Sequence, residues 1–269
     1  MMQIIIISIS ALVLVATAYI YAVNRALYRR MFKYRDFNWC NPTQAEMPKF
    51  AEHTANTKDG QVRSIWYAKG KKNAPVVLYL HGNAYSIATT AFILSPYVDA
   101  GFTVCLAEYR GFDKTGGKLS EQGFWIDAHA AYEFLKSQGH KNIFIHGTSM
   151  GASIASKLAS DLEKRNEKLG GVILESPFYS VVSMCPKIPF KKLLLGDKFA
   201  TNKYVTGIKK SPVLLMHGAK DYLVGLEQAG RLFPEIASEN KRFHVIGPGT
   251  HELFVHGSME YAVEWINGF

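Results

Sequence analysis

The sequence predicts an α/β fold in which a mostly parallel sheet is covered by helices on both faces. Short apolar, β-branched runs alternate with longer segments of helical character along most of the chain. This alternation is typical of parallel sheets, because a helix usually carries the chain back between neighbouring parallel strands. Hydrophobic residues make up 48% of the 269 residues and charged residues 20%, which indicates a packed globular core. The expected strands span residues 76–80, 103–107, 142–146, 171–174, 213–216 and 243–246, and the expected helices span 87–99, 121–137, 150–164, 225–233 and 256–267.

Two segments depart from this alternation. The β-rich run 63–68 precedes the first strand–helix unit, and we expect it to add an antiparallel edge strand. Residues 177–210 contain three prolines, several apolar residues and seven lysines against one aspartate. We interpret 177–210 as a short cap insertion over the edge of the sheet where ligands bind.

The N-terminus contains an apolar segment long enough to cross a membrane. Residues 4–23 form a run of 20 residues without a charge, which is about the length that a membrane-spanning helix needs. Tyr19 and Tyr21 lie near one end of the run, as aromatic residues do at membrane interfaces. We therefore predict a transmembrane anchor over residues 1–23. A cleaved signal peptide is the alternative, but no basic residue precedes the run, which is longer than the usual signal-peptide core.

Residues 24–60 are predicted to be a basic juxtamembrane connector, and residues 61–269 the α/β domain. The first part of the connector, 24–36, holds five basic residues against one acidic residue. Positive charge on this side of the anchor predicts a cytoplasmic α/β domain by the positive-inside rule. The basic segments favour contact with an anionic membrane. No nucleic-acid-binding motif is present, so we expect no nucleic-acid partner.

The three cysteines indicate neither a disulfide framework nor a zinc site. Cys40, Cys105 and Cys185 are odd in number and widely spaced, without the paired spacing of metal ligands. We therefore expect no metal, and the chemistry considered below requires no organic cofactor.

A glycine-flanked serine lies between an expected strand and an expected helix. The segment Gly147-Thr148-Ser149-Met150-Gly151 matches G-x-S-x-G and joins the strand 142–146 to the helix 150–164. A tight strand–turn–helix connection needs small residues two positions before and two after the serine. Such a turn raises the serine hydroxyl above the sheet, at the start of a helix. Ser149 is therefore the candidate nucleophile.

A serine hydroxyl needs a base to accept its proton and an acid to orient that base. His146 is close in sequence, but it ends the strand below the turn, and we expect it to be structural. His251 follows the last expected strand through the loop 247–250 and is the expected base, with His256 as the fallback. Asp221 follows another strand and is the expected acid, although such an aspartate can also be a helix N-cap.

Acyl transfer also requires two N–H donors for the developing oxyanion. Met150, directly after the candidate nucleophile, supplies one backbone N–H. The second is expected from the backbone of Asn83, because a strand ends at His81-Gly82 and the glycine permits a close backbone approach.

With these segments identified, the chain resembles the α/β-hydrolase superfamily, and more narrowly its membrane-anchored Bem46-like and ABHD17-like group. The resemblance covers about residues 60–269 and implies an α/β-hydrolase fold with a Ser149–His251–Asp221 catalytic triad. The order serine, acid, histidine along the chain fits this superfamily. The segments that carry the resemblance are "LYLHGNA" at 78–84, "YRGF" at 109–112, "GTSMGA" at 147–152, "PVLLMHGAKDYLV" at 212–224 and "GTHEL" at 249–253.

The expected function is a serine hydrolase that cleaves a carboxylic ester, a thioester or a lipid acyl bond through an acyl-enzyme. A serine peptidase or aminopeptidase of the same fold is the nearest alternative. A catalytically silent scaffold tethered to the membrane is the alternative of another class. Apolar residues of the cap insertion could line an acyl pocket, although core packing of the cap explains them equally well. These residues are Phe178, Ile188, Phe190 and Leu193.

Overall fold

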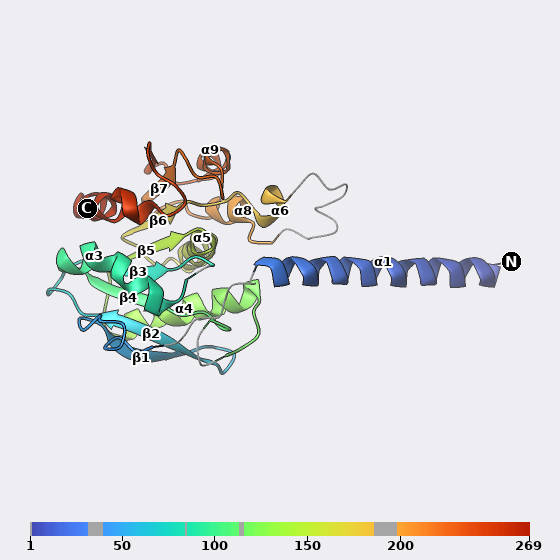
Figure 1. Ribbon diagram of the computed structural model, residues 1–269, viewed down its shortest axis with the longest axis horizontal. Coiled ribbons are helices and arrows are strands. Elements are labelled where there is room, and N and C mark those ends of the chain that lie inside the picture. The colour runs from blue at the N-terminus through green and yellow to red at the C-terminus, as the bar shows by residue number, and fades with distance from the viewer. Residues whose placement is uncertain (1, 32–39, 84, 113–115, 186–197) are drawn as a thin grey trace.

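The sheet is built from eight strands in the order β1-β2-β4-β3-β5-β6-β7-β8 (Figure 1). The computed structural model of the protein describes residues 2–31, 40–83, 85–112, 116–185 and 198–269. From β3 to β8 all neighbouring strands are parallel, whereas β2 pairs antiparallel with β1 and β4. The strands are β1 Ala51–Asn56, β2 Val62–Ala68, β3 Val76–Leu80, β4 Thr103–Ala107, β5 Ile143–Thr148, β6 Gly171–Glu175, β7 Val213–Gly218 and β8 Lys241–Ile246.

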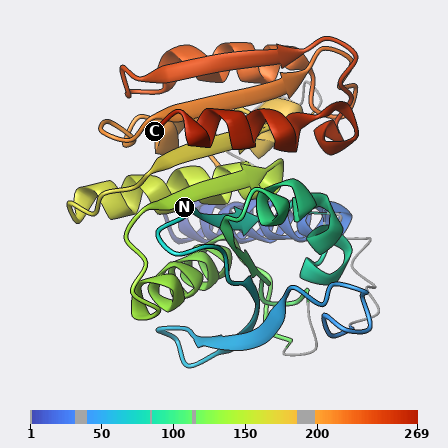
Figure 2. The ribbon, with the colours of Figure 1, turned by 90° about the vertical axis from the view of Figure 1, so that its left-hand side faces the viewer.

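Helices cover both faces of this sheet, as Figure 2 shows. One apolar layer lies between the sheet and α4, α5, α8 and α9, and the other lies between the sheet and α2, η1, α3 and α10. Every residue of β3, β4 and β6 is buried, which explains their continuous apolar sequences. The expectation of a mostly parallel sheet between two helical layers is thereby confirmed. The helical elements are α1 Met2–Met31, α2 Ile87–Thr90, η1 Ala91–Leu94, α3 Ser95–Asp99, α4 Glu121–Ser137, α5 Met150–Lys164, α6 Val181–Met184, α8 Thr201–Val205, α9 Leu226–Leu232, η2 Phe233–Glu235, η3 Leu253–His256 and α10 Ser258–Asn267.

Two elements differ from the sequence-based prediction. Residues 51–56, expected within the connector, form the edge strand β1, so β2 lies inside the sheet. This strand is polar and mostly exposed, and it therefore lacks the apolar pattern on which strand prediction depends. Residues 87–99, expected as one helix, divide into α2, η1 and α3. Pro96 lies in the first turn of α3, where it has no N–H to continue the earlier helical ladder.

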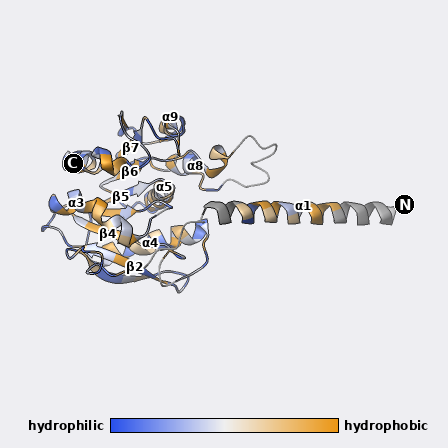
Figure 3. Cartoon of the chain, viewed as in Figure 1, coloured by the Kyte–Doolittle hydropathy of each residue, from blue (hydrophilic) through white to orange (hydrophobic). Residues whose placement is uncertain are grey.

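Helix α1 extends away from the α/β domain in Figure 1. Several of its apolar side chains, including Leu12, Leu14 and Val15, are exposed, and Figure 3 shows apolar residues in the middle part of the helix. In the described part of the chain, no helix combines the length and apolarity that crossing a membrane requires. The membrane anchor and the cytoplasmic location of the domain stay predictions.

The cap insertion is described only at its two ends. Residues 186–197 lie outside the described residues, and with them the expected pocket residues Ile188, Phe190 and Leu193. The ends of the insertion come together, because the Val181 N–H donates to the Lys198 carbonyl over 3.2 Å. Helices α6 and α8 flank this junction.

Helix α5 approaches the sheet so closely that two positions admit only glycine. A Cβ added at Gly151 would overlap the backbone carbonyl of Leu80 at the end of β3, and one added at Gly147 would overlap the Gly151 backbone. Neither obstacle is a flexible side chain, so the helix itself would have to shift.

We therefore expect Gly151→Ala to lower the free energy of unfolding by about 1–3 kcal/mol, the usual cost of overpacking. Gly230→Ala is the matched control, because this α9 position has open space around its Cα and should gain about 0.5–1 kcal/mol. Guanidinium denaturation of both variants measures the difference. Equal stability of the two variants would contradict the close approach of α5.

Candidate active site

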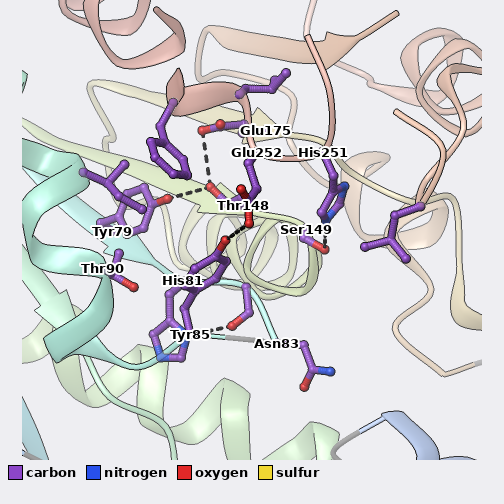
Figure 4. A pocket seen from close by; sticks show the side chains of 15 residues that line it. Tyr79, His81, Asn83, Tyr85, Thr90, Thr148, Ser149, Glu175, His251 and Glu252 are labelled. Atoms are coloured by element: carbon purple, nitrogen blue, oxygen red, sulfur yellow. Dashed lines mark hydrogen bonds between the residues drawn. The ribbon is translucent and has the colours of Figure 1, made fainter. Parts of the chain in front are cut away.

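Three side chains from the ends of three strands form a hydrogen-bonded chain. Ser149 follows β5, Asp221 follows β7 and His251 follows β8. The His251 Nε2 lies 3.1 Å from the Ser149 Oγ, and the His251 Nδ1 lies 2.7 Å from the Asp221 Oδ2. Figure 4 shows His251 and Ser149 pointing toward one another. The structure thus brings together the three residues that the sequence suggested, although 102 positions separate the serine from the histidine.

The turn at Ser149 has a backbone conformation that side chains rarely adopt. Its φ is 56° and its ψ is −114°, which for a residue other than glycine costs on the order of 1–3 kcal/mol. The Ser149 N–H donates to the Glu175 carbonyl over 2.8 Å, so the neighbouring strand β6 holds the turn. The hydroxyl consequently stands at the N-terminus of α5.

Asp221 is buried and held by three hydrogen bonds, with His217 beside it. Its Oδ1 accepts the N–H groups of Leu223 and Val224 at 3.0 and 2.8 Å. Its Oδ2 faces His251 at 2.7 Å and His217 at 3.4 Å. Burial alone raises the pKa of this carboxyl, but the hydrogen bonds outweigh burial and hold the pKa well below its ordinary range.

An ionised Asp221 determines which ring nitrogen of His251 carries the proton. A carboxylate only accepts, so the His251 Nδ1 donates to Asp221, and Nε2 faces the Ser149 hydroxyl with its lone pair. The arrangement can therefore move a proton from Ser149 Oγ to His251 Nε2. The resulting imidazolium would lie against a carboxylate that is already charged.

Met150 and Asn83 both lie beside Ser149. Met150 is the first residue of α5, and the first N–H groups of a helix have no partner within it. Asn83 lines the cavity next to Ser149. A Cβ added at Gly82 would lie 3.5 Å from the Ser149 Cβ, so the Gly82–Asn83 peptide passes close to the serine.

The cavity beside Ser149 has a volume of about 200 Å³. Its apolar wall comes from Ile93 in η1 and from Leu253 and Phe254 in η3. Polar groups also line it, and several of them are hydrogen-bonded to one another. Tyr79 bonds to Thr148, Thr148 to Glu175, and Tyr85 to Glu252.

Phe178 does not line this cavity. It is buried in the apolar layer under α4 and α5, with its ring 6.5 Å from that of Phe199. Ile93 and Leu253, which do line the cavity, belong to the layer on the opposite face of the sheet. The acyl-pocket role suggested for Phe178 is therefore corrected, because the chain after β6 turns this ring into the core.

The alternative histidines lie elsewhere. His146 is fully buried, with Nε2 2.9 Å from Glu175 Oε2 and Nδ1 2.7 Å from the Tyr97 hydroxyl. Its partners are thus a carboxylate and a phenol below the turn. His256 ends η3 and is not among the residues that line the cavity. Within the described ranges, no cluster of three or more His, Cys, Asp or Glu side chains could hold a metal ion.

Sequence reasoning missed two buried polar residues of the site. His217 contacts Asp221, and Glu175 lines the cavity floor while accepting from His146, Thr148 and Ser258. The sequence did carry a signal for both residues, because each one ends a strand that is otherwise apolar. A polar residue at that position is expensive to bury unless it has a partner.

The strain at Ser149 leads to a prediction about stability. We expect Ser149→Gly to be more stable than Ser149→Ala by about 1 kcal/mol, because glycine relieves the strain but loses more backbone entropy on folding. At Ser153, inside α5, the order should reverse, with glycine less stable than alanine by about 1 kcal/mol. Urea denaturation of the four variants tests this; the same order at both positions would show that Ser149 is unstrained.

Comparisons with known proteins extend this description. Residues 71–210 match the family model Hydrolase_4, described as serine aminopeptidase, S33. The chain is 30% identical over 193 residues to Protein bem46 of Schizosaccharomyces pombe, covering 68% of this chain and 64% of that protein. It is 30% identical over 207 residues to lysophosphatidylserine lipase ABHD12 of Danio rerio, covering 70% of this chain and 53% of that protein. The matches thus span about half to two-thirds of these relatives' lengths.

Among solved structures, an α/β-hydrolase of Vibrio vulnificus superposes with a TM-score of 0.75 at 23% identity, covering 92% of this chain and 94% of that one. This likeness confirms the fold, and the match to bem46 confirms the resemblance to Bem46-like proteins. The chain therefore has the α/β-hydrolase fold and belongs to the serine aminopeptidase S33 family of hydrolases.

Proposed function

We propose that the protein is a serine hydrolase that cleaves a carboxylic ester, a thioester or a lipid acyl bond through an acyl-enzyme. The observation that carries the proposal is the hydrogen-bonded chain Asp221–His251–Ser149 beside a partly apolar cavity. The family supports hydrolysis, and the lipase among the relatives supports an acyl substrate.

In the acylation step, the Ser149 Oγ attacks the substrate carbonyl carbon while His251 Nε2 accepts the hydroxyl proton. The carbonyl π electrons move to oxygen, and the Met150 and Asn83 N–H groups stabilise this oxyanion. When the tetrahedral intermediate collapses, the bond to the leaving group breaks and His251 returns the proton to that group. The acyl group remains esterified to Ser149.

In the deacylation step, water takes the place of the leaving group. His251 Nε2 accepts a proton from the water as its oxygen attacks the acyl carbon, and the same two N–H groups stabilise the second oxyanion. Collapse breaks the bond to Ser149 Oγ, which regains the proton from His251. Asp221 keeps the imidazole oriented throughout and stabilises its charged form.

The cavity supports a short acyl group. Its volume of about 200 Å³ is below the ~300–1,000 Å³ typical of pockets for drug-sized ligands. Ile93, Leu253 and Phe254 supply apolar contacts for such a group. A longer chain would have to extend past the rim.

An aminopeptidase is the second candidate, and two carboxylates favour it. Glu175 and Glu252 line the cavity, and a carboxylate is the group that would bind a substrate ammonium. Both carboxylates already accept hydrogen bonds, from His146 and Tyr85 among others. Hydrolysis of aminoacyl 4-nitroanilides, lost in Glu252→Gln, would favour this candidate over the esterase.

The catalytic assignment is tested with a fluorophosphonate probe and a p-nitrophenyl ester. We expect Ser149→Ala to abolish labelling and His251→Ala to lower both labelling rate and kcat by about 10⁴-fold, because the hydroxyl then lacks its base. Ser153→Ala, one helical turn further along α5, should label like the wild type. Undiminished labelling of either site variant would refute the assignment.

The cavity predicts a preference among acyl chains. In a series of p-nitrophenyl esters, we expect kcat/KM to be highest for short acyl groups, and Ile93→Ala to move the optimum to longer chains by roughly two carbons, about the volume removed. Ile126→Ala is the control, since Ile126 is similarly buried at 9% exposure against 6% for Ile93 and lies on α4. An unchanged optimum in Ile93→Ala would mean that the acyl group binds elsewhere.

A further inference from the structure

His81 occupies a position in which both of its ring nitrogens have a hydrogen-bond partner. It is buried directly after β3, with 1% of its surface exposed. Its Nδ1 lies 2.8 Å from the Gly82 carbonyl oxygen, and its Nε2 lies 2.8 Å from the Glu108 Oε1. A carbonyl oxygen can only accept, so the Nδ1 must carry a proton.

Glu108 is held by backbone donors on both of its carboxyl oxygens. Its Oε1 accepts the Tyr109 N–H and its Oε2 accepts the Ile87 N–H, both over 3.0 Å. Since the same Oε1 lies 2.8 Å from His81 Nε2, the buried ring is held at both of its nitrogens, by Glu108 on one side and by the Gly82 carbonyl on the other.

The bond from His81 fixes the orientation of the Gly82–Asn83 peptide. This peptide is trans, so its C=O and N–H point in opposite directions. With the carbonyl directed at the His81 ring, the Asn83 N–H points away from the ring. A Cβ added at Gly82 would lie in van der Waals contact with the Ser149 Cβ, and Asn83 lines the cavity, so the N–H is presented on the side where the oxyanion would develop.

The His81–Glu108 contact also ties this loop to the neighbouring strand. Glu108 follows β4 and bonds Ile87 at the start of α2, while the Tyr109 hydroxyl donates to the His81 carbonyl over 3.2 Å. Both ends of the segment 81–87 are therefore anchored to the residues after β4. A peptide so constrained does not need to reorganise when negative charge develops beside it.

We propose that His81 is a positioning residue for the oxyanion hole, held by Glu108, that fixes and polarises the Gly82–Asn83 peptide. The inference rests on the proposed serine hydrolase function, in which Asn83 supplies an oxyanion donor. A hydrogen bond to the Gly82 carbonyl strengthens the N–H on the other side of the peptide as a donor, since linked hydrogen bonds polarise one another. His81 itself does not touch the substrate oxygen.

The hydrogen bond from His81 Nδ1 to the Gly82 carbonyl is tested first, without any substrate. In ¹⁵N-histidine-labelled wild type at neutral pH, the His81 signals are assigned by their absence from His81→Asn. We expect a one-bond N–H coupling at Nδ1. A His81 ring without a proton on Nδ1 would overturn the proposal.

Kinetics with a p-nitrophenyl ester then test the positioning role. His81→Leu removes the donor to Gly82, and we expect kcat to fall about 10²–10³-fold, the usual loss for an oxyanion-hole donor, with little change in KM. His81→Asn keeps an amide N–H near the place of Nδ1 and should recover about tenfold of that loss, since it restores a donor to the Gly82 carbonyl. Circular dichroism establishes that both variants are folded.

His140→Leu is the matched control, because His140 also has a hydrogen-bonded ring, to the Tyr67 hydroxyl, but precedes β5 at the other end of the sheet. It should keep the wild-type kcat. A folded His81→Leu with wild-type kcat, or an Asn variant no better than Leu, would overturn the proposal. A different result would overturn the proposed function itself. In that case hydrolysis or labelling would persist in Ser149→Ala, whatever the result for the His81 variants.

Discussion

The close contact of α5 with the ends of β3 and β5 is the constraint on which the rest of the site depends. Gly147 and Gly151 leave no space for a side chain between helix and strands, so the chain must reverse within the few residues between them. The reversal forces Ser149 into its unusual φ of 56°. Because β3 lies next to β5 in the sheet, the same contact brings the Gly82–Asn83 peptide against the serine. The placement of Ser149 and of the two N–H groups beside it is thus a consequence of one packing arrangement.

A row of histidines and carboxylates runs across this edge of the sheet, below and beside Ser149. Each carboxylate is buried and faces at least one histidine: His81–Glu108 and His146–Glu175 join adjacent strands, and His217–Asp221 joins the end of β7 to the turn after it. Buried charges of this kind are tolerated only when hydrogen bonds replace the lost hydration. The pairs therefore fix the strand ends relative to one another. An edge lined only by apolar side chains would allow the strand ends to shift slightly. In sheet order from β4 to β7, the residues are Glu108, His81, His146, Glu175, His217 and Asp221.

The parts that the sequence predicted are those with a local signal. Buried strands are mostly apolar, and the serine turn has its glycines, so both could be recognised without the structure. Asp221 and His251 could be proposed because parallel strands end at one edge, where loops from distant parts of the chain meet. The edge strand β1 gives no such signal, since its residues are polar and exposed.

The remaining features depend on neighbours that the sequence does not reveal. Phe178 was assigned to a pocket because it is apolar, but only the structure shows that it faces the opposite side of the sheet from the cavity. The His81–Glu108 pair joins residues 27 positions apart. The pair can form because β3 and β4 are neighbours in the sheet. The alternation of helices and strands along the sequence does not reveal which strands are neighbours.

The arrangement of charge around Ser149 also matches the charges that acyl transfer creates. On the β7 side lies the carboxylate of Asp221, against the ring of His251, which becomes positive when it accepts the serine proton. On the β3 side the His81 ring lies behind the peptide that faces the negative oxygen. Hydrolysis through Ser149 separates a positive charge from a negative one along this direction, and a fixed field already oriented that way lowers the barrier without reorganisation. Replacing His81 while keeping Asp221 should therefore reduce the stabilisation of the oxyanion more than the stabilisation of the His251 imidazolium. For this reason, a loss in kcat with little change in KM is the informative result.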